Sequence, residues 1–232
     1  MKKASLLVFL AALLCATTAY AQETTLLSFT GYDYEDPGDG GTYLAVGDGY
    51  KSVGFITSVG SILASYIDFS SNENTYYLFG LTVTNRFFDP VNNYLSVDFG
   101  NGGRVRYFED AKSRPGYAAD YGTTPPPNPT SPSTFIDPNP NNPALGGVVN
   151  GFHLDYFTDD HSGGWSGAMT LDEGYDLIYV NPGQRSGWLL GGVFQTGVVP
   201  SGYDNQVEGN CRVPATPTNQ KTWGAVKALY HR

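Results

Sequence analysis

The chain has 232 residues, of which 22 are acidic and 13 basic, so its formal net charge at pH 7 is −9. This charge disfavours nucleic acid and anionic membrane surfaces as partners. Only 2 Cys are present, which excludes a disulfide-built scaffold, and 29 Gly, 17 Tyr and 13 Phe favour sheets and turns over helices.

Residues 1–21 are predicted to be a cleavable secretory signal peptide. The cationic start "MKK" precedes an apolar run too short to span a membrane comfortably, and "AYA" at 19–21 is a small-x-small cleavage site. A membrane anchor and lipoprotein processing at Cys15 are alternatives, but Leu14 is not the small residue that such processing wants. We expect export to the periplasm, the cell surface or the medium, with no transmembrane segment in the mature chain.

Residues 22–213 are predicted to form one all-β domain. Short strand signals alternate with turns rich in Gly, Pro, Asn and Asp, and no segment before Pro214 shows a clear helical period. This pattern is typical of a sandwich or a barrel, and we expect an antiparallel β-sandwich of jelly-roll or Greek-key style.

The strongest strand signal is "NTYYLFGLTVTN" at 74–85. Its alternation predicts four side chains on one face: Tyr77, Phe79, Leu81 and Val83. Residues 94–110 are predicted to be a hairpin, because the loop "GNGG" joins two alternating runs and its residues tolerate positive φ.

Residues 121–147 hold most of the proline and are predicted to be an extended loop, since proline cannot donate to a sheet. The favoured interpretation is a crossing between sheets in which Phe135 and Ile136 pack against the core. The alternative is a binding or protease-sensitive loop.

Three segments resemble a pattern in uncharacterised exported bacterial proteins, some of which carry the PEP-CTERM sorting tail. The segments are Tyr76–Thr84, Gly102–Tyr107 and Pro132–Asp137. The resemblance implies an extracellular β-sandwich without assigned catalysis. The chain lacks the Pro-Glu-Pro signature and the hydrophobic sorting helix, so that sorting route is not implied.

The residues that most often carry catalysis show no strong motif. Ser166 in "GGWSGA" lacks the second Gly and the following helix of a nucleophile elbow. His153, His161 and His231 are too widely spaced for a usual zinc motif. Cys211 is predicted to be a buried thiol on the last strand, with a nucleophile or an intermolecular disulfide as the alternatives.

Calcium is the one metal that the sequence suggests. The segment "GYDYEDPGDGG" at 31–41 gathers acidic side chains in a Gly-rich turn, and the predicted ligands are Asp33, Glu35 and Asp39. The spacing is not that of an EF-hand. The alternative is an ordinary turn on an acidic surface.

Residues 214–232 are predicted to be a Pro/Thr linker followed by a short amphipathic helix, "KTWGAVKALYHR". The tail is interpreted either as part of the fold or as a sorting signal, with weak membrane binding as a third alternative. Recognition by export or surface machinery would use Trp223, Val226, Lys227, Leu229 and Tyr230.

The predicted function is a secreted, non-enzymatic structural or binding role outside the cell, with a polysaccharide or surface component as partner and no cofactor unless Ca²⁺ binds. A carbohydrate-binding module, calcium-dependent or not, is the first alternative, because exposed aromatic rings can stack on sugars. A secreted hydrolase of unrecognised type is the second. No carboxylate stands in an apolar setting in the sequence, although Glu173 and Glu208 lie in or beside strands.

Overall fold

The computed structural model describes residues 24–37, 41–112, 135–136, 139–195 and 199–213. They form nine strands and two short 3₁₀ helices: β1 (Thr24–Asp36), β2 (Gly49–Val59), β3 (Asn72–Asp89), β4 (Tyr94–Phe99), β5 (Gly103–Ala111), β6 (Leu145–Phe157), β7 (Ser162–Glu173), η2 (Tyr175–Tyr179), η3 (Pro182–Gln184), β8 (Trp188–Gln195) and β9 (Asn205–Val213). The predicted signal peptide and C-terminal tail lie outside these residues. Within the described residues, no helix has the length and apolar character needed to cross a membrane.

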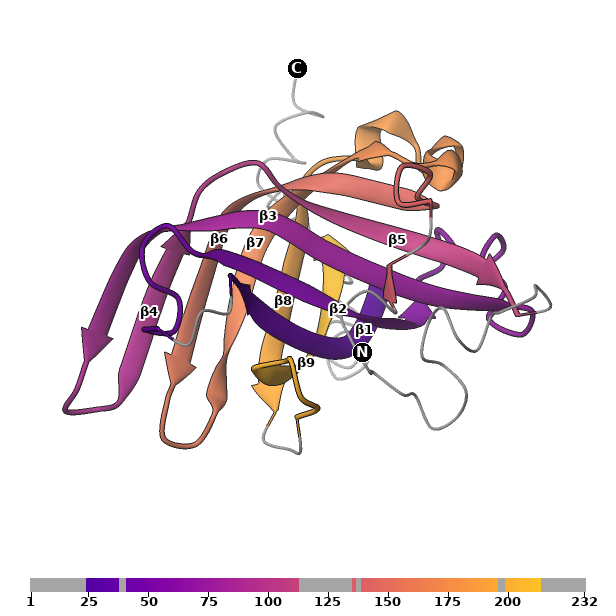
Figure 1. Ribbon diagram of the computed structural model, residues 1–232. Helices are drawn as coiled ribbons and strands as arrows, with labels where there is room; N and C mark the ends of the chain where they lie inside the picture. The colour runs from indigo at the N-terminus through magenta and orange to yellow at the C-terminus, as the bar shows by residue number, and fades with distance from the viewer. Residues whose placement is uncertain (1–23, 38–40, 113–134, 137–138, 196–198, 214–232) are drawn as a thin grey trace, which may run out of the picture. The chain divides into compact units, whose positions relative to one another are not determined.

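The strands close into an antiparallel barrel. β1 is hydrogen-bonded to β2 on one side and to β9 on the other. From β2 the pairing passes through β3, β5, β6, β7 and β8 and returns to β9, which makes a ring of eight strands with β4 as one extra strand (Figure 1). The prediction of a β-sandwich is therefore wrong.

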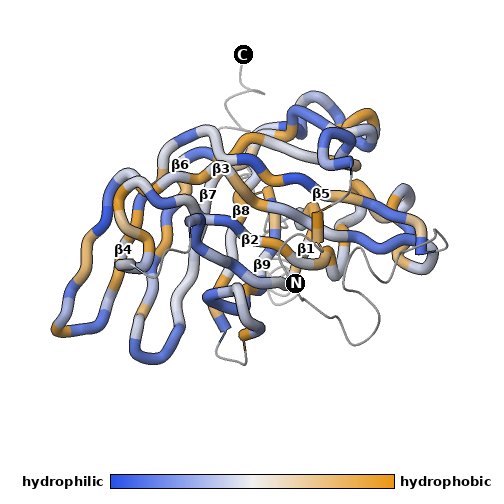
Figure 2. The backbone as a smooth tube through the Cα atoms, viewed as in Figure 1, coloured by the Kyte–Doolittle hydropathy of each residue, from blue (hydrophilic) through white to orange (hydrophobic). Residues whose placement is uncertain are grey.

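Alternation cannot distinguish the two architectures, because strands of a sandwich and of a filled barrel both turn every second side chain inward. Figure 2 shows hydrophobic and hydrophilic residues alternating along the strands. The decisive fact is the pairing of the first strand with the last: Thr24 lies opposite Val213, and Leu27 lies opposite Cys211. Closure removes the free sheet edges that a sandwich leaves to be protected.

The Gly-rich segment 100–102 interrupts a long strand and does not turn a hairpin. β4 and β5 both pair antiparallel with β3, and both also pair with β6, so they run in the same direction. The prediction of a hairpin at 94–110 is wrong, and the reversal lies at 90–93, before β4. Gly102 has φ 97°, a conformation that side chains disfavour, which explains the need for Gly in this bulge.

A second irregularity lies in β3. Gly80 has φ 73°, and it shifts the alternation of the strand. Tyr77 and Phe79 are only half-buried, whereas Leu81 and Val83 are each 1% exposed and belong to the core. The four residues predicted to share one face are therefore divided between the two faces of the barrel wall.

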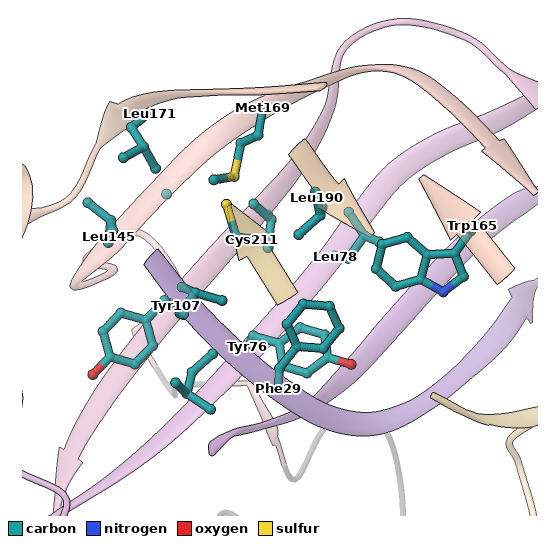
Figure 3. Close-up of a pocket in the computed structure, with 14 residues that line it drawn as sticks. Phe29, Tyr76, Leu78, Tyr107, Leu145, Trp165, Met169, Leu171, Leu190 and Cys211 are labelled. Carbon is teal, nitrogen blue, oxygen red and sulfur yellow. The ribbon is translucent and has the colours of Figure 1, made fainter. Parts of the chain in front are cut away.

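The barrel interior is filled by apolar and aromatic side chains. Phe29 stacks on Trp165 with ring centroids 5.8 Å apart and contacts Tyr76 at 4.8 Å. Figure 3 shows Met169 and Cys211 directed into the same interior space. A cavity between these side chains measures about 20 Å³, which is room for about one water molecule. The prediction that Cys211 is buried is confirmed, and burial raises the pKa of its thiol.

A second apolar cluster lies around Val53, Phe135 and Tyr203. Phe135, from the Pro-rich segment, is fully buried, and its ring lies 5.0 Å from that of Phe55 on β2. Ile136 packs against the same cluster. The predicted anchoring of this segment by Phe135 and Ile136 is confirmed, although their contact is a cluster separate from the barrel interior.

The two ends of the barrel follow from the strand directions. One end, which we call the turn end, lies where β1, β3, β6 and β8 end. The other end, which we call the terminal end, lies where β2, β5 and β7 end and where Thr24 pairs with Val213.

Candidate functional site

A row of mostly polar residues crosses the outer face of the barrel. Successive cross-strand pairs join Asn85, Asp98, His153, Ser166, Gly191, Asn210 and Ser28, on β3, β4, β6, β7, β8, β9 and β1. Since neighbouring strands lie about 4.8 Å apart, the six steps of this row follow the curved sheet for about 29 Å. No other outward-facing row joins so many polar side chains in the described ranges.

Part of this row lies in an open groove of about 800 Å³, which we call the outer groove. Polar side chains line it from several strands: Ser28, Asn150, Ser166, Glu208, Asn210 and Arg212. A smaller hollow of about 280 Å³ adjoins the groove and includes His153 and Asp155, and both hollows are lined by Ser166 and Gly192. The two hollows therefore form one continuous depression.

Two outward-facing glycines create this depression. Gly191 lies opposite Ser166 and Asn210, and Gly164 lies opposite Asp155. At Gly164 a Cβ would lie only 2.8 Å from the carbonyl oxygen of Gly192, so this position requires Gly. At Gly191 a side chain would stand on the outer surface, as those of its neighbours do. Its absence leaves the backbone of β7 and β8 accessible on the floor of the depression.

His153 connects two carboxylates at one end of the row. Its Nδ1 lies 2.7 Å from Asp98 Oδ1, and its Nε2 lies 3.1 Å from Asp155 Oδ1. Partial burial lowers the pKa of His153, but the hydrogen bonds with Asp98 and Asp155 outweigh burial and raise this pKa above its ordinary value. Both ring nitrogens face carboxylate oxygens, so the imidazolium form can donate a hydrogen bond from each.

The register between β6 and β7 places Ser166 directly opposite His153. This pairing could not be predicted from the sequence. A serine nucleophile needs a neutral imidazole nitrogen to accept its proton. Here Nε2 of His153 faces Asp155, while the pKa of the ring is raised. The arrangement therefore suits fixed hydrogen bonding better than proton abstraction from Ser166.

The predicted calcium ligands lead to a second group of carboxyls, at the turn end. Asp33 is fully buried, and it accepts hydrogen bonds from the backbone N–H of Asn205 at 2.7 Å and from its Nδ2 at 3.3 Å. Glu35 accepts from the backbone N–H of Leu44 at 2.7 Å. The backbone N–H of Glu35 donates to Asp204 at 2.8 Å. Asp39 lies outside the described residues.

Burial, followed by the nearby charge of Asp204, raises the pKa of Asp33 to about 8. Burial and a hydrogen bond with Asp48 raise the pKa of Glu35 to about 7, and burial raises that of Asp204. The interpretation that no carboxyl has an apolar setting is wrong for Asp33. The sequence feature that could have predicted the burial of Asp33 is the alternation of β1. This alternation places Asp33 on the same inward face as Phe29.

The described residues include no set of three or more His, Cys, Asp and Glu side chains arranged to hold a metal ion. The calcium site stays a prediction. The structure adds Asp48 and Asp204 to the carboxyls near Asp33 and Glu35, both from later in the chain.

Glu173 and Glu208, the two carboxylates singled out beside strands, lie in different settings. Glu173 is paired with Arg104 at 2.8 Å and with Arg106 at 2.9 Å. Burial raises the pKa of Glu173, but hydrogen bonds from the two arginines outweigh burial and lower it. Glu208 lies in the outer groove and accepts a hydrogen bond from Gln195.

Of the other histidines, His161 lies at the turn end, where its Nδ1 is 2.6 Å from the hydroxyl of Tyr156. Outside the described residues lie His231 and the predicted tail residues Trp223, Val226, Lys227, Leu229 and Tyr230.

Comparison of the chain with protein-family models, with curated proteins and with solved structures gave no match.

Proposed function

We propose that the chain is an exported, non-enzymatic protein that binds a polysaccharide on the outer face of its barrel. The observation that carries the proposal is the outer groove, an open depression of about 800 Å³ lined by polar side chains together with the exposed Leu189 and Val193. The filled interior, with a cavity of only about 20 Å³, supports an external site. Export itself is proposed from the signal-like residues 1–21.

The chemistry of the groove supports a neutral, hydroxyl-rich ligand. Sugar hydroxyls both donate and accept hydrogen bonds, and the walls offer hydroxyl, amide, carboxylate and guanidinium groups. An acidic chain with net charge −9 is a poor match for a polyanion. The long, open row also suits a polymer better than a small molecule, which prefers an enclosing pocket.

The proposal can be tested with a variant that places a large side chain in the outer groove and leaves the core unchanged. A Cβ at Gly191 would lie 3.5 Å from its nearest neighbour, the carbonyl oxygen of Trp165, which is ordinary contact. The Gly191→Tyr variant should therefore fold and block the groove. Gly183→Tyr is the matched control, because a Cβ there also has its nearest contact at 3.5 Å and Gly183 lies on η3, away from the groove.

Cellulose, chitin, xylan and mixed-linkage glucan are suitable probes, in pull-down for insoluble forms and affinity electrophoresis for soluble ones. We expect the unmodified chain and Gly183→Tyr to bind the same polysaccharide, and Gly191→Tyr to bind it at least about tenfold more weakly, a loss of about 1.4 kcal/mol. Absence of binding to every probe, or equal binding by Gly191→Tyr, would contradict the proposal.

A further inference from the structure

Exposed aromatic side chains border the groove system at the tips of β3, β4 and β6. Phe87 is 58% exposed and Phe157 is 41% exposed. The rings of Tyr94 and Phe157 are cross-strand neighbours with centroids 5.3 Å apart. Phe87 lies opposite Ser96, one outward position from Tyr94. We call these three residues the aromatic rim. Figure 2 shows hydrophobic colour at the β3–β4 tip beside the hydrophilic β6–β7 turn.

The aromatic rim faces away from the barrel interior. Tyr156 and Leu95, which alternate with Phe157 and Tyr94, are 4% and 0% exposed and fill the core. The outward rings therefore contribute little to the core, and their exposure opposes solubility. Such a patch, rimmed by polar side chains, is typical of an interaction site.

Hydrogen bonds hold one member of the rim, Tyr94, in a fixed arrangement. The hydroxyl of Tyr94 donates to Asp155 Oδ1, the atom that also faces His153 Nε2. His153 in turn is bonded to Asp98, which accepts from Asn85 Nδ2 at 3.1 Å. This chain of contacts across three strands orients the Tyr94 ring before any ligand arrives, which reduces the entropy lost on binding.

Continuity and charge indicate the occupant. Asp155 and His153 line the hollow that opens into the outer groove, so the rim extends the same depression. Asp89, Asp98 and Asp155 surround the rim on the outer face, which disfavours an anionic lipid surface. A sugar ring suits both features, because it has an apolar face for stacking and hydroxyls for the carboxylates.

We propose that Phe87, Tyr94 and Phe157 form a stacking subsite that takes the apolar face of one sugar ring of the polysaccharide bound in the outer groove. This inference rests on the proposed function. It makes the bound polymer extend from β9 across β8, β7 and β6 to the β3–β4 tip. Long oligosaccharides should therefore gain affinity from the rim, and short ones that fill only the groove should not.

The experiment measures the affinity of a length series of oligosaccharides, prepared from whichever of the four probes binds, by titration calorimetry. The variants are Phe157→Ala and Phe87→Ala, and the control is Phe69→Ala, which removes another exposed aromatic side chain, 36% exposed and distant in the fold. Thermal melting establishes that each variant is folded. We expect the rim variants to weaken binding of the long oligosaccharides about fivefold and to leave the shortest binding members unchanged.

Each outcome has one meaning. If Gly191→Tyr blocks binding but the rim variants bind every length as the unmodified chain does, the stacking subsite is wrong and the proposed function stands. If the unmodified chain binds none of the probes, both proposals fail. Binding to anionic phospholipid vesicles that Phe87→Ala abolishes, or a dimer in sedimentation that Phe87→Ala dissociates, would also overturn the subsite, since the rim would then contact lipid or a second copy.

Discussion

At the scale of single residues, polar side chains on the inward face distinguish this barrel from a simple apolar core. Asp33, Ser52, Asn74 and Asn205 are all at most 4% exposed. Asp33 is bonded to Asn205, and Tyr107 donates to Asn74 at 2.5 Å. These bonds offset the cost of burial. Alternation could predict that Asp33 points inward, but its partner Asn205 comes from the last strand and could not be predicted without the barrel closure.

The raised pKa of Asp33 makes stability depend on pH. The folded chain keeps this proton up to about pH 8, whereas the unfolded chain releases it near the ordinary value of 3.8. Between these values the folded state binds more protons, so the free energy of unfolding should decrease as pH rises from about 4 to about 8. In Asp33→Asn this decrease should be smaller. Urea unfolding across the interval measures it, with the exposed Asp68→Asn as control. Equal slopes for Asp33→Asn and the unmodified chain would contradict the assignment.

The calcium prediction is also tested at this scale. If Asp33, Glu35 and Asp39 bind Ca²⁺, a chelator should lower the melting temperature. The effect should be larger at pH 8 than at pH 6, because protons compete for carboxyls whose pKa values are raised to about 8 and about 7. Differential scanning fluorimetry with and without chelator measures the shift, and Glu35→Gln should reduce it. No shift at either pH removes the calcium site.

At the scale of elements, strand positions are readable from the sequence and strand partners are not. The alternation at 74–85 and 94–110 correctly marks extended chain, since β3, β4 and β5 occupy these residues. The sequence could not show that "GNGG" bulges within a strand, because the same residues suit a tight turn and a bulge. The row of polar residues on the outer face could not be predicted for the same reason. Asp98, His153 and Ser166 become neighbours only through the register of strand pairing.

The bulge between β4 and β5 has a testable cost. Gly102 has φ 97°, and a Cβ at this position would have no non-bonded neighbour within 4 Å. Gly102→Ala should therefore lower the free energy of unfolding by about 1–2 kcal/mol through backbone strain alone. Gly100→Ala is the control, because its nearest contact, Thr84 Cγ2 at 3.4 Å, is ordinary. Urea unfolding of both variants decides the matter. A Gly100→Ala loss equal to that of Gly102→Ala would show that packing, and not φ, sets the cost.

At the scale of the whole molecule, closure of the sheet separates the interior from the outer face. A closed ring of eight strands can either hold a ligand inside or fill its interior with side chains. Here Phe29, Tyr76 and Trp165 pack against one another and leave about 20 Å³. The ligand binding that we propose is therefore placed on the outside of the wall.

The filled interior predicts that the barrel does not take up a long apolar molecule. A fluorescent fatty acid titrated into the protein should show no saturable binding, because its chain needs far more space than one water molecule. Met169→Ala enlarges the interior and should lower the free energy of unfolding by about 2–5 kcal/mol. The same titration of this variant gives the comparison with the unmodified chain. Stoichiometric uptake by the unmodified chain would show that the interior opens, and would favour an internal ligand over the outer groove.

The pairing of Thr24 with Val213 also bears on how the chain could be rearranged. Because the two residues are cross-strand neighbours at one end of the ring, a short peptide could join them without crossing the sheet. New termini could then be cut at an exposed turn such as 158–161, giving a circular permutant with the same strand pairings. The outer groove would survive this change, since it depends on which strands are neighbours and not on which strand is made first.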